Sequence, residues 1–261
     1  MEDIYRELRQ AARSIAAQYP SPDFYYDFPL SMARSRKIFE DDELIKSLRK
    51  IVQEESPDHI GHGLEHAETV ALDAGAITAI ETDRADFSPE QINHAVLLAL
   101  CAGLLHDIRR QEADHAVQGA AAARQILARQ MVLELARERS LGARDINRIA
   151  FAIEHHEAFK SYSRPRSVES RVLAGSLYDA DKFRWGPDNF TCTVWDMIAA
   201  SPPPPEKFAR LYPRAMAYIA GIKETFRTAV GREYGPQFID IGLDIGNALW
   251  HRLQERLPRT D

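Results

Sequence analysis

The residues with the clearest chemical potential are His106 and Asp107, which directly follow the almost unbroken apolar run 96–105. A carboxylate and an imidazole at the end of a buried segment need strong polar partners. A divalent cation would satisfy both. It would have to lie near a helix end, because consecutive helical residues point about 100° apart. Taken alone, the dipeptide favours a simpler interpretation, a core histidine with a capping aspartate.

Residues of the same two types end other apolar segments of the chain. They are His66, the pair His155-His156 and Asp181. Each one can be explained as a cap or a satisfied core group, but four such coincidences on successive apolar helices are harder to explain that way. Imidazole and carboxylate are ligands for Mn, Fe, Co, Ni and Zn. The chain has only two cysteines, so no thiolate cluster indicates a structural zinc site.

The spacing of apolar residues predicts that helices position all of these groups, in an all-α fold. Ser88-Pro89-Glu90-Gln91 is a typical helix start, with serine as the N-cap. The aromatic segment 19–29 is expected to cover the core, 185–190 to form a turn, and the prolines 202–205 to form a spacer. Helices are expected at about 4–18, 31–54 (interrupted near 41), 61–81, 88–106, 115–135, 143–157, 168–181, 206–230 and 237–256.

Composition excludes several functional classes. The 261 residues are 45% hydrophobic and 28% charged, which is ordinary for a soluble globular protein. A net charge of −6 gives no sign of nucleic-acid binding. The apolar run is too short to span a bilayer, and the charged N-terminus has no signal segment. We therefore expect one cytoplasmic domain over residues 1–261, with no membrane association.

At this point the chain resembles the HD superfamily of metal-dependent phosphohydrolases. The resemblance rests on His66 in the segment 62–70, on Leu-Leu-His-Asp-Ile around His106, and on Asp181 in Asp-Ala-Asp-Lys. It covers about 56–184, roughly half the chain. It implies a helical-bundle HD core there, with the helices of 1–55 and 185–261 packed on it. The metal ligands that it implies are His66, His106, Asp107 and Asp181.

Two further features suggest a second metal ion. His115 follows the central pair closely, and His155-His156 resembles the double histidine of family members that bind two metals. The spacing departs from the two-metal pattern, because His115 is only nine positions after His106 (115 − 106 = 9). If His155 and His156 are not ligands, we expect them to bind phosphate or steer the nucleophile. We expect His62 to support the site in the same indirect way.

The resemblance predicts hydrolysis of a small phosphate ester or anhydride, such as a nucleotide, by water that one or two divalent ions activate. Asp107 and His106 would form the catalytic centre. Positive charge is needed on the phosphoryl oxygens. We expect it from Lys182 and Arg109, which directly adjoin the ligand motifs, with Lys160 nearby. The wider set of candidates is Arg109, Arg110, Lys160, Arg164, Lys182 and Arg184.

Two other functions fit the same residues. A di-iron oxygenase of the HD type would need two irons, and therefore His115 or the 155–156 pair as ligands. A non-catalytic nucleotide-binding module on an HD scaffold would bind a nucleotide tightly without turnover.

Overall fold

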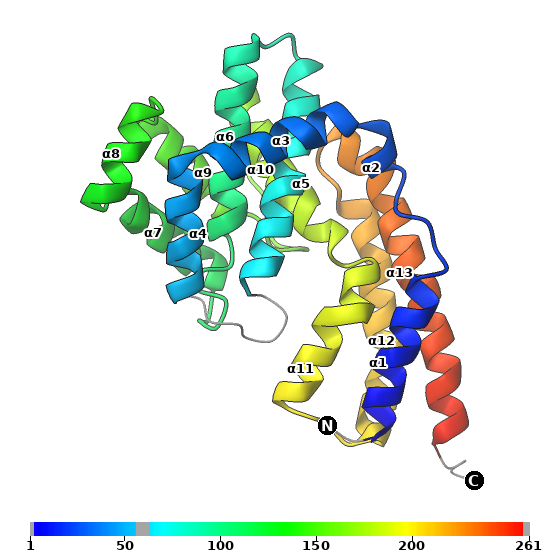
Figure 1. Ribbon diagram of the computed structural model, residues 1–261. Coiled ribbons are helices and arrows are strands. Elements are labelled where there is room, and N and C mark those ends of the chain that lie inside the picture. The colour runs from blue at the N-terminus through cyan, green and yellow to red at the C-terminus, as the bar shows by residue number, and fades with distance from the viewer. Residues whose placement is uncertain (1–2, 56–62, 258–261) are drawn as a thin grey trace.

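In the computed structural model the described residues, 3–55 and 63–257, form helices and no strands, which confirms the all-α prediction. Figure 1 shows α1, α12 and α13 side by side at one end of the molecule, and α7 and α8 at the other. The elements are α1 (Asp3–Ala16), α2 (Phe24–Asp27), α3 (Pro29–Asp41), α4 (Glu43–Glu55), α5 (Leu64–Asp83), α6 (Pro89–Leu105), α7 (His115–Leu127), α8 (Gln130–Glu138), α9 (Ala143–Glu154), α10 (Val168–Phe183), η1 (Asn189–Thr193), α11 (Val194–Ala200), α12 (Pro205–Gly221), η2 (Ile222–Thr225) and α13 (Ala229–Arg256).

Helix α6 is the centre of the bundle, and it begins as predicted. The Ser88 hydroxyl accepts a hydrogen bond from the Gln91 amide at 3.3 Å, and the Gln91 side chain accepts one from the Ser88 amide at 2.8 Å. This reciprocal cap satisfies two amides that a helix start leaves without partners. From Val96 to Leu105 every residue is buried, so the helix cannot shift without disturbing its neighbours.

Helices α5 and α6 approach each other unusually closely at Gly103. A β-carbon on Gly103 would lie 2.3 Å from the Cα of Ala71 and 2.7 Å from its backbone nitrogen. Real side chains do not tolerate such distances, so only glycine fits this contact. The crossing lies between His66, five residues before Ala71, and His106, three residues after Gly103. It therefore sets the distance between these two histidines.

The N-terminal aromatic segment covers the core, as expected. The Phe24 ring is fully buried and contacts Phe183 at 5.4 Å between centroids. Beside it, Arg184 donates to the carboxylate of Asp73 at 2.6 Å and to the Tyr25 hydroxyl at 2.9 Å. This network joins α10, α5 and α2, so Arg184 ties helices together and is not a phosphate ligand in this arrangement.

Several predicted element boundaries were wrong. The segment 115–135 is two helices, α7 and α8, with a break at 128–129, and α9 ends at Glu154, before the two histidines. The segment 185–190 is not a simple turn, because it leads into a π-helical turn and then α11. The helix expected at 206–230 ends at Gly221, and the last helix starts at Ala229 although Pro236 lies inside it.

The early start of α13 has a long-range cause. The Thr228 hydroxyl caps the helix by accepting from the Gly231 amide at 2.8 Å. The buried carboxylate of Asp179 on α10 accepts from the Arg227 and Thr228 amides at 2.8 Å each. Burial raises the pKa of Asp179 to about 6, against the lowering effect of these hydrogen bonds. Asp179 therefore orients the start of α13, and none of the groups of potential metal ligands among the described residues includes it.

The helices share one contiguous hydrophobic core, which includes buried side chains from α1 near the N-terminus to α13. The C-terminal helices pack back onto the rest, since α13 contacts α1, α5, α10 and α12. Within the described residues, no helix combines the length and apolarity needed to cross a membrane. The predicted helix start near Gly61, and His62, lie outside the described residues.

Candidate metal centre

Side chains from five helix ends meet at one end of the bundle. His66 lies in the first turn of α5, His106 and Asp107 follow α6, and Asp181 lies in the last turn of α10. The ends of α6, α9 and α10 that reach the cluster are C-terminal, where the helix dipole favours positive charge. The members of the cluster are His66, His106, Asp107, His115, His156 and Asp181, which form three overlapping groups of potential metal ligands.

The first half of the cluster contains the four predicted ligands. The Nε2 atoms of His66 and His106 are 3.3 Å apart. The nearest Asp107 oxygen, Oδ2, is 3.5 Å from His106 Nε2, and Asp181 Oδ1 is 3.6 Å from His66 Nε2. Two ligands about 2.1 Å from one ion, at angles of about 90–109°, are about 3.0–3.4 Å apart. Each of the two histidines therefore lies within 3.5–3.9 Å of both carboxylates, close to the spacing of ligands on a shared ion.

In the second half of the cluster, His115 and His156 lie near the other oxygen of Asp107, Oδ1. His156 Nε2 lies 3.5 Å and His115 Nε2 lies 3.7 Å from Asp107 Oδ1. Asp107 thus has two histidines beside each of its oxygens. Together, Asp107, His115 and His156 form a further group with ligand-like spacing.

Backbone contacts determine which nitrogen of the two most buried histidines is available. His106 Nδ1 lies 2.7 Å from the Gly103 carbonyl, and His156 Nδ1 lies 2.6 Å from the Ile153 carbonyl. A carbonyl only accepts, so each Nδ1 carries the proton and each neutral ring has a bare Nε2 facing the cluster. Metal-ligating histidines are commonly oriented by such a hydrogen bond. The capping role and the ligand role are therefore compatible.

The electrostatic environment keeps these groups in their ligating forms. Burial lowers the pKa of His106, and burial together with Arg110 lowers the pKa of His115, so both rings favour the neutral state. Burial opposes ionisation of Asp181, but the adjacent Lys182 ammonium lowers its pKa below the ordinary value. Neutral imidazoles and ionised carboxylates are the forms that bind metals.

The cations beside the cluster differ in part from those predicted. Lys182 lies there as expected, buried and paired with Asp181. Arg109 instead contacts Glu55 at 3.4 Å and Glu112 at 3.5 Å. Its neighbour Arg110 is the arginine at the cluster, with a nitrogen 2.8 Å from His115 Nε2 and another 3.9 Å from Asp107 Oδ2. Lys160 is exposed in the loop after α9.

His155 is not brought into the cluster, unlike its neighbour His156. The ring of His155 stacks on Phe151 at 4.1 Å, its Nδ1 lies 3.0 Å from the Phe151 carbonyl, and none of the three described groups includes it. Its own carbonyl accepts a hydrogen bond from Arg227 at 2.6 Å. His155 therefore helps to hold the loop that carries His156.

Two residues near the cluster were not predicted from the sequence. Glu157 lies 4.0 Å from His115 Nδ1. Arg227 stacks between Tyr178, at 3.6 Å, and Tyr162, at 4.1 Å. The position of Glu157 directly after the histidine pair was a usable signal, but nothing near Arg227 in the sequence relates it to this site.

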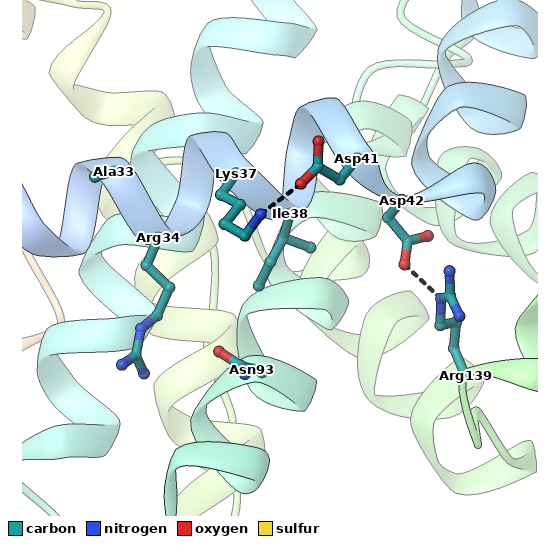
Figure 2. A pocket seen from close by; sticks show the side chains of 8 residues that line it. All are labelled: Ala33, Arg34, Lys37, Ile38, Asp41, Asp42, Asn93 and Arg139. Carbon is teal, nitrogen blue, oxygen red and sulfur yellow. Dashed lines mark hydrogen bonds and ion pairs between the residues drawn. The ribbon is translucent and has the colours of Figure 1, made fainter.

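A separate pocket of about 460 Å³ lies between α3, α6 and the end of α8, as Figure 2 shows. Its charged walls pair internally, Lys37 with Asp41 and Arg139 with Asp42. Its lining includes no member of the histidine–aspartate cluster. The cavity and the chemically capable residues are therefore in different places, and the cluster is the better candidate for function.

In comparisons with known proteins, no family model, no curated protein and no solved structure matches this chain. The resemblance to the HD superfamily therefore stays a prediction from the sequence motifs.

Proposed function

We propose that this protein is a metal-dependent phosphohydrolase of the HD superfamily with two divalent cations. His66, His106, Asp107 and Asp181 would hold one ion. Asp107, His115 and His156 would hold the other. Imidazole and carboxylate ligands suit Mn, Fe, Co, Ni or Zn.

The observation that carries this proposal is the position of Asp107. Each oxygen of its carboxylate has two histidine Nε2 atoms near it, all four within 4.0 Å of the nearer oxygen. An aspartate that only capped a helix would need at most one histidine this close to its carboxylate. Four buried or half-buried imidazoles around one carboxylate are costly to remove from water, and a shared divalent cation would compensate that cost.

In the proposed reaction, the metal ions and the protein side chains would have separate roles. When bound, divalent cations polarise the phosphoryl oxygens and lower the pKa of water. Asp107 would orient the attacking water by accepting its hydrogen bond. Lys182 keeps Asp181 ionised, and Arg110 supplies positive charge toward the phosphoryl oxygens. The substrate class is a small phosphate ester or anhydride, such as a nucleotide.

Arg110 has a second role in this proposal. Its guanidinium lies against His115 Nε2, the atom that would bind the second ion. The side chain is 42% exposed, so it can turn away from His115 without disturbing the core. In the metal-free protein, Arg110 thus supplies the positive charge beside His115. When the second ion binds there, the guanidinium could turn toward a phosphate group of the substrate.

The test is elemental analysis of protein purified without added metal, followed by a phosphate-release assay with nucleotides and phosphomonoesters. Asp107→Ala should lose bound metal and all phosphate release while its helical circular dichroism stays near wild type. Lys37→Ala, at an exposed position on α3 in the separate pocket that no cluster residue lines, serves as the control and should keep the metal and the phosphate release. Phosphate release that persists after complete removal of metal by a chelator would contradict the proposal.

A di-iron oxygenase is the second candidate, and one observation favours it. Such an enzyme needs two irons, and the two groups of potential ligands that share Asp107 could hold them. The discriminating measurements are oxygen uptake and an electron paramagnetic resonance signal from iron-loaded protein. Oxygen uptake should be absent if the protein is a hydrolase.

A further inference from the structure

Three aromatic side chains form an exposed cluster, the aromatic ladder, outside the metal-type residues. The rings of Phe159 and Tyr218 are 4.9 Å apart at 68°, and those of Tyr218 and Trp185 are 5.4 Å apart at 45°. Phe159 is 54% exposed and Tyr218 is 46% exposed. Edge-on and tilted contacts leave ring faces uncovered, so the ladder presents apolar surface to solvent.

The backbone at Phe159 is in an unfavourable conformation. Its φ is +60°, in the left-handed region that bulky residues rarely adopt. The ring packs next to Gly221 of α12, where a β-carbon on the glycine would lie 3.4 Å from Phe159 Cζ. The loop after α9 therefore holds a large ring in a strained position, half exposed. Such strain is concentrated at functional sites.

The aromatic ladder adjoins the candidate metal centre. Burial raises the pKa of Tyr218, the Glu157 carboxylate raises it further, and Arg110 lowers it, so both charged groups act on this side of the ladder. Glu157 and Arg110 are the two residues that approach His115. At the other end, the Trp185 amide donates to the Lys182 carbonyl at 3.0 Å. Phe159 follows the cluster residue His156 by three positions and Trp185 follows Asp181 by four, so both rings stand on segments that lead out of the cluster.

We propose that Phe159 and Tyr218, supported by Trp185, form a subsite that stacks a planar ring of the substrate while its phosphate lies toward Arg110 and the metal centre. This inference rests on the proposed function, and it narrows the substrate to phosphate esters that carry a flat aromatic or heteroaromatic group. Stacking on exposed aromatic side chains is tolerant of ring identity. The subsite therefore selects the class of substrate but not one particular ring.

A matched pair of probes tests the subsite. Adenosine 5′-monophosphate and ribose 5-phosphate carry the same phosphate on the same sugar carbon and differ in the planar base. Loss of one stacking ring should weaken binding of the first on the order of tenfold and leave the second unchanged. The variants are Phe159→Ala and Tyr218→Ala, with Phe159→Trp to restore a ring. Leu211→Ala is the control, because Leu211 is 49% exposed on the same helix as Tyr218.

Two readouts separate this proposal from the proposed function. Calorimetric affinities for both probes, measured on metal-free protein, report on the subsite alone. We expect tighter binding of the adenosine compound in wild type, Phe159→Trp and Leu211→Ala than in the two alanine variants. Equal affinity for both probes, or the same adenosine affinity in all variants, overturns the subsite.

In metal-loaded protein, the alanine variants should raise KM for the adenosine compound with little change in kcat. A lowered kcat with unchanged KM for both probes also overturns the subsite, since it indicates a structural role. Preserved stacking without any phosphate release supports the subsite and contradicts the proposed function only.

Discussion

The close crossing of α5 and α6 makes Gly103→Ala a sensitive test of how the fold positions the candidate metal centre. The added β-carbon would lie 2.3 Å from the Cα of Ala71. Comfortable carbon–carbon contacts are about 3.5–4.0 Å. The two helices must therefore separate by about 1.2 Å or more, because the atoms in contact belong to a backbone that cannot rotate away.

The expected magnitude has two parts. Overpacking costs about 1–3 kcal/mol, and a backbone clash puts this substitution at the upper end. Alanine gains about 1 kcal/mol in helix propensity over glycine. The net loss in the free energy of unfolding should be about 2 kcal/mol. Because the His66 and His106 nitrogens are 3.3 Å apart, a separation of this size also takes them beyond the spacing that one ion allows.

The assay combines denaturant unfolding with calorimetric binding of Mn²⁺. We expect metal affinity to fall at least tenfold, as when a group that orients metal ligands is lost. The matched control is Gly142→Ala, where a β-carbon meets nothing within 4 Å; it should leave metal affinity unchanged. If Gly103→Ala keeps wild-type stability and wild-type affinity, the helix crossing does not set the histidine spacing.

Three other predictions follow from particular contacts. Asp73→Ala should lower the free energy of unfolding by about 2 kcal/mol, because Arg184 loses its buried carboxylate partner and keeps only Asp188 and the Tyr25 hydroxyl. Bound metal, measured by elemental analysis, should not change. Burial lowers the pKa of His106 from 6.5, so below about pH 6.5 the unfolded state binds a proton at this residue and the folded state does not. The metal-free protein should therefore lose stability as the pH falls below about 6.5. Equal stability at pH 7.5 and pH 5.5, measured by denaturant unfolding, would contradict a neutral buried ring. Arg110→Met should tighten binding of the second ion by freeing His115 and raise KM for phosphate esters; titration with Mn²⁺ that shows weaker second-ion binding would mean that Arg110 helps to form that site.

The metal-type cluster was visible in the sequence because its members stand at the ends of apolar helices. His106 and Asp107 follow a run of buried residues, and polar groups there are constrained by burial. The distinction between Arg109 and Arg110 was not visible, since both adjoin the motif and only the turn after α6 decides which one faces His115. The same holds for the two histidines after α9, of which one turns into the cluster and the other stacks on Phe151.

Helix boundaries were predictable where the signal is local and failed where it is tertiary. The capping box at Ser88 lies within four residues, so the sequence pattern was sufficient. The start of α13 at Ala229 depends on Asp179, which lies 49 positions before Thr228 along the chain. Pro236 indicated a break there, but a proline removes only one intrahelical hydrogen bond, and packing of the buried α13 residues outweighs that loss.

The most direct test of the metal centre is the number of ions per chain in wild type and in two single variants. Elemental analysis after equilibration with Mn²⁺ and removal of excess metal should give two ions in wild type, one in His156→Ala and none in Asp107→Ala. Two ions retained in Asp107→Ala would contradict the assignment of Asp107 as the shared ligand. The assignment would also be contradicted if wild-type protein bound no ion after equilibration with each of Mn, Fe, Co, Ni and Zn.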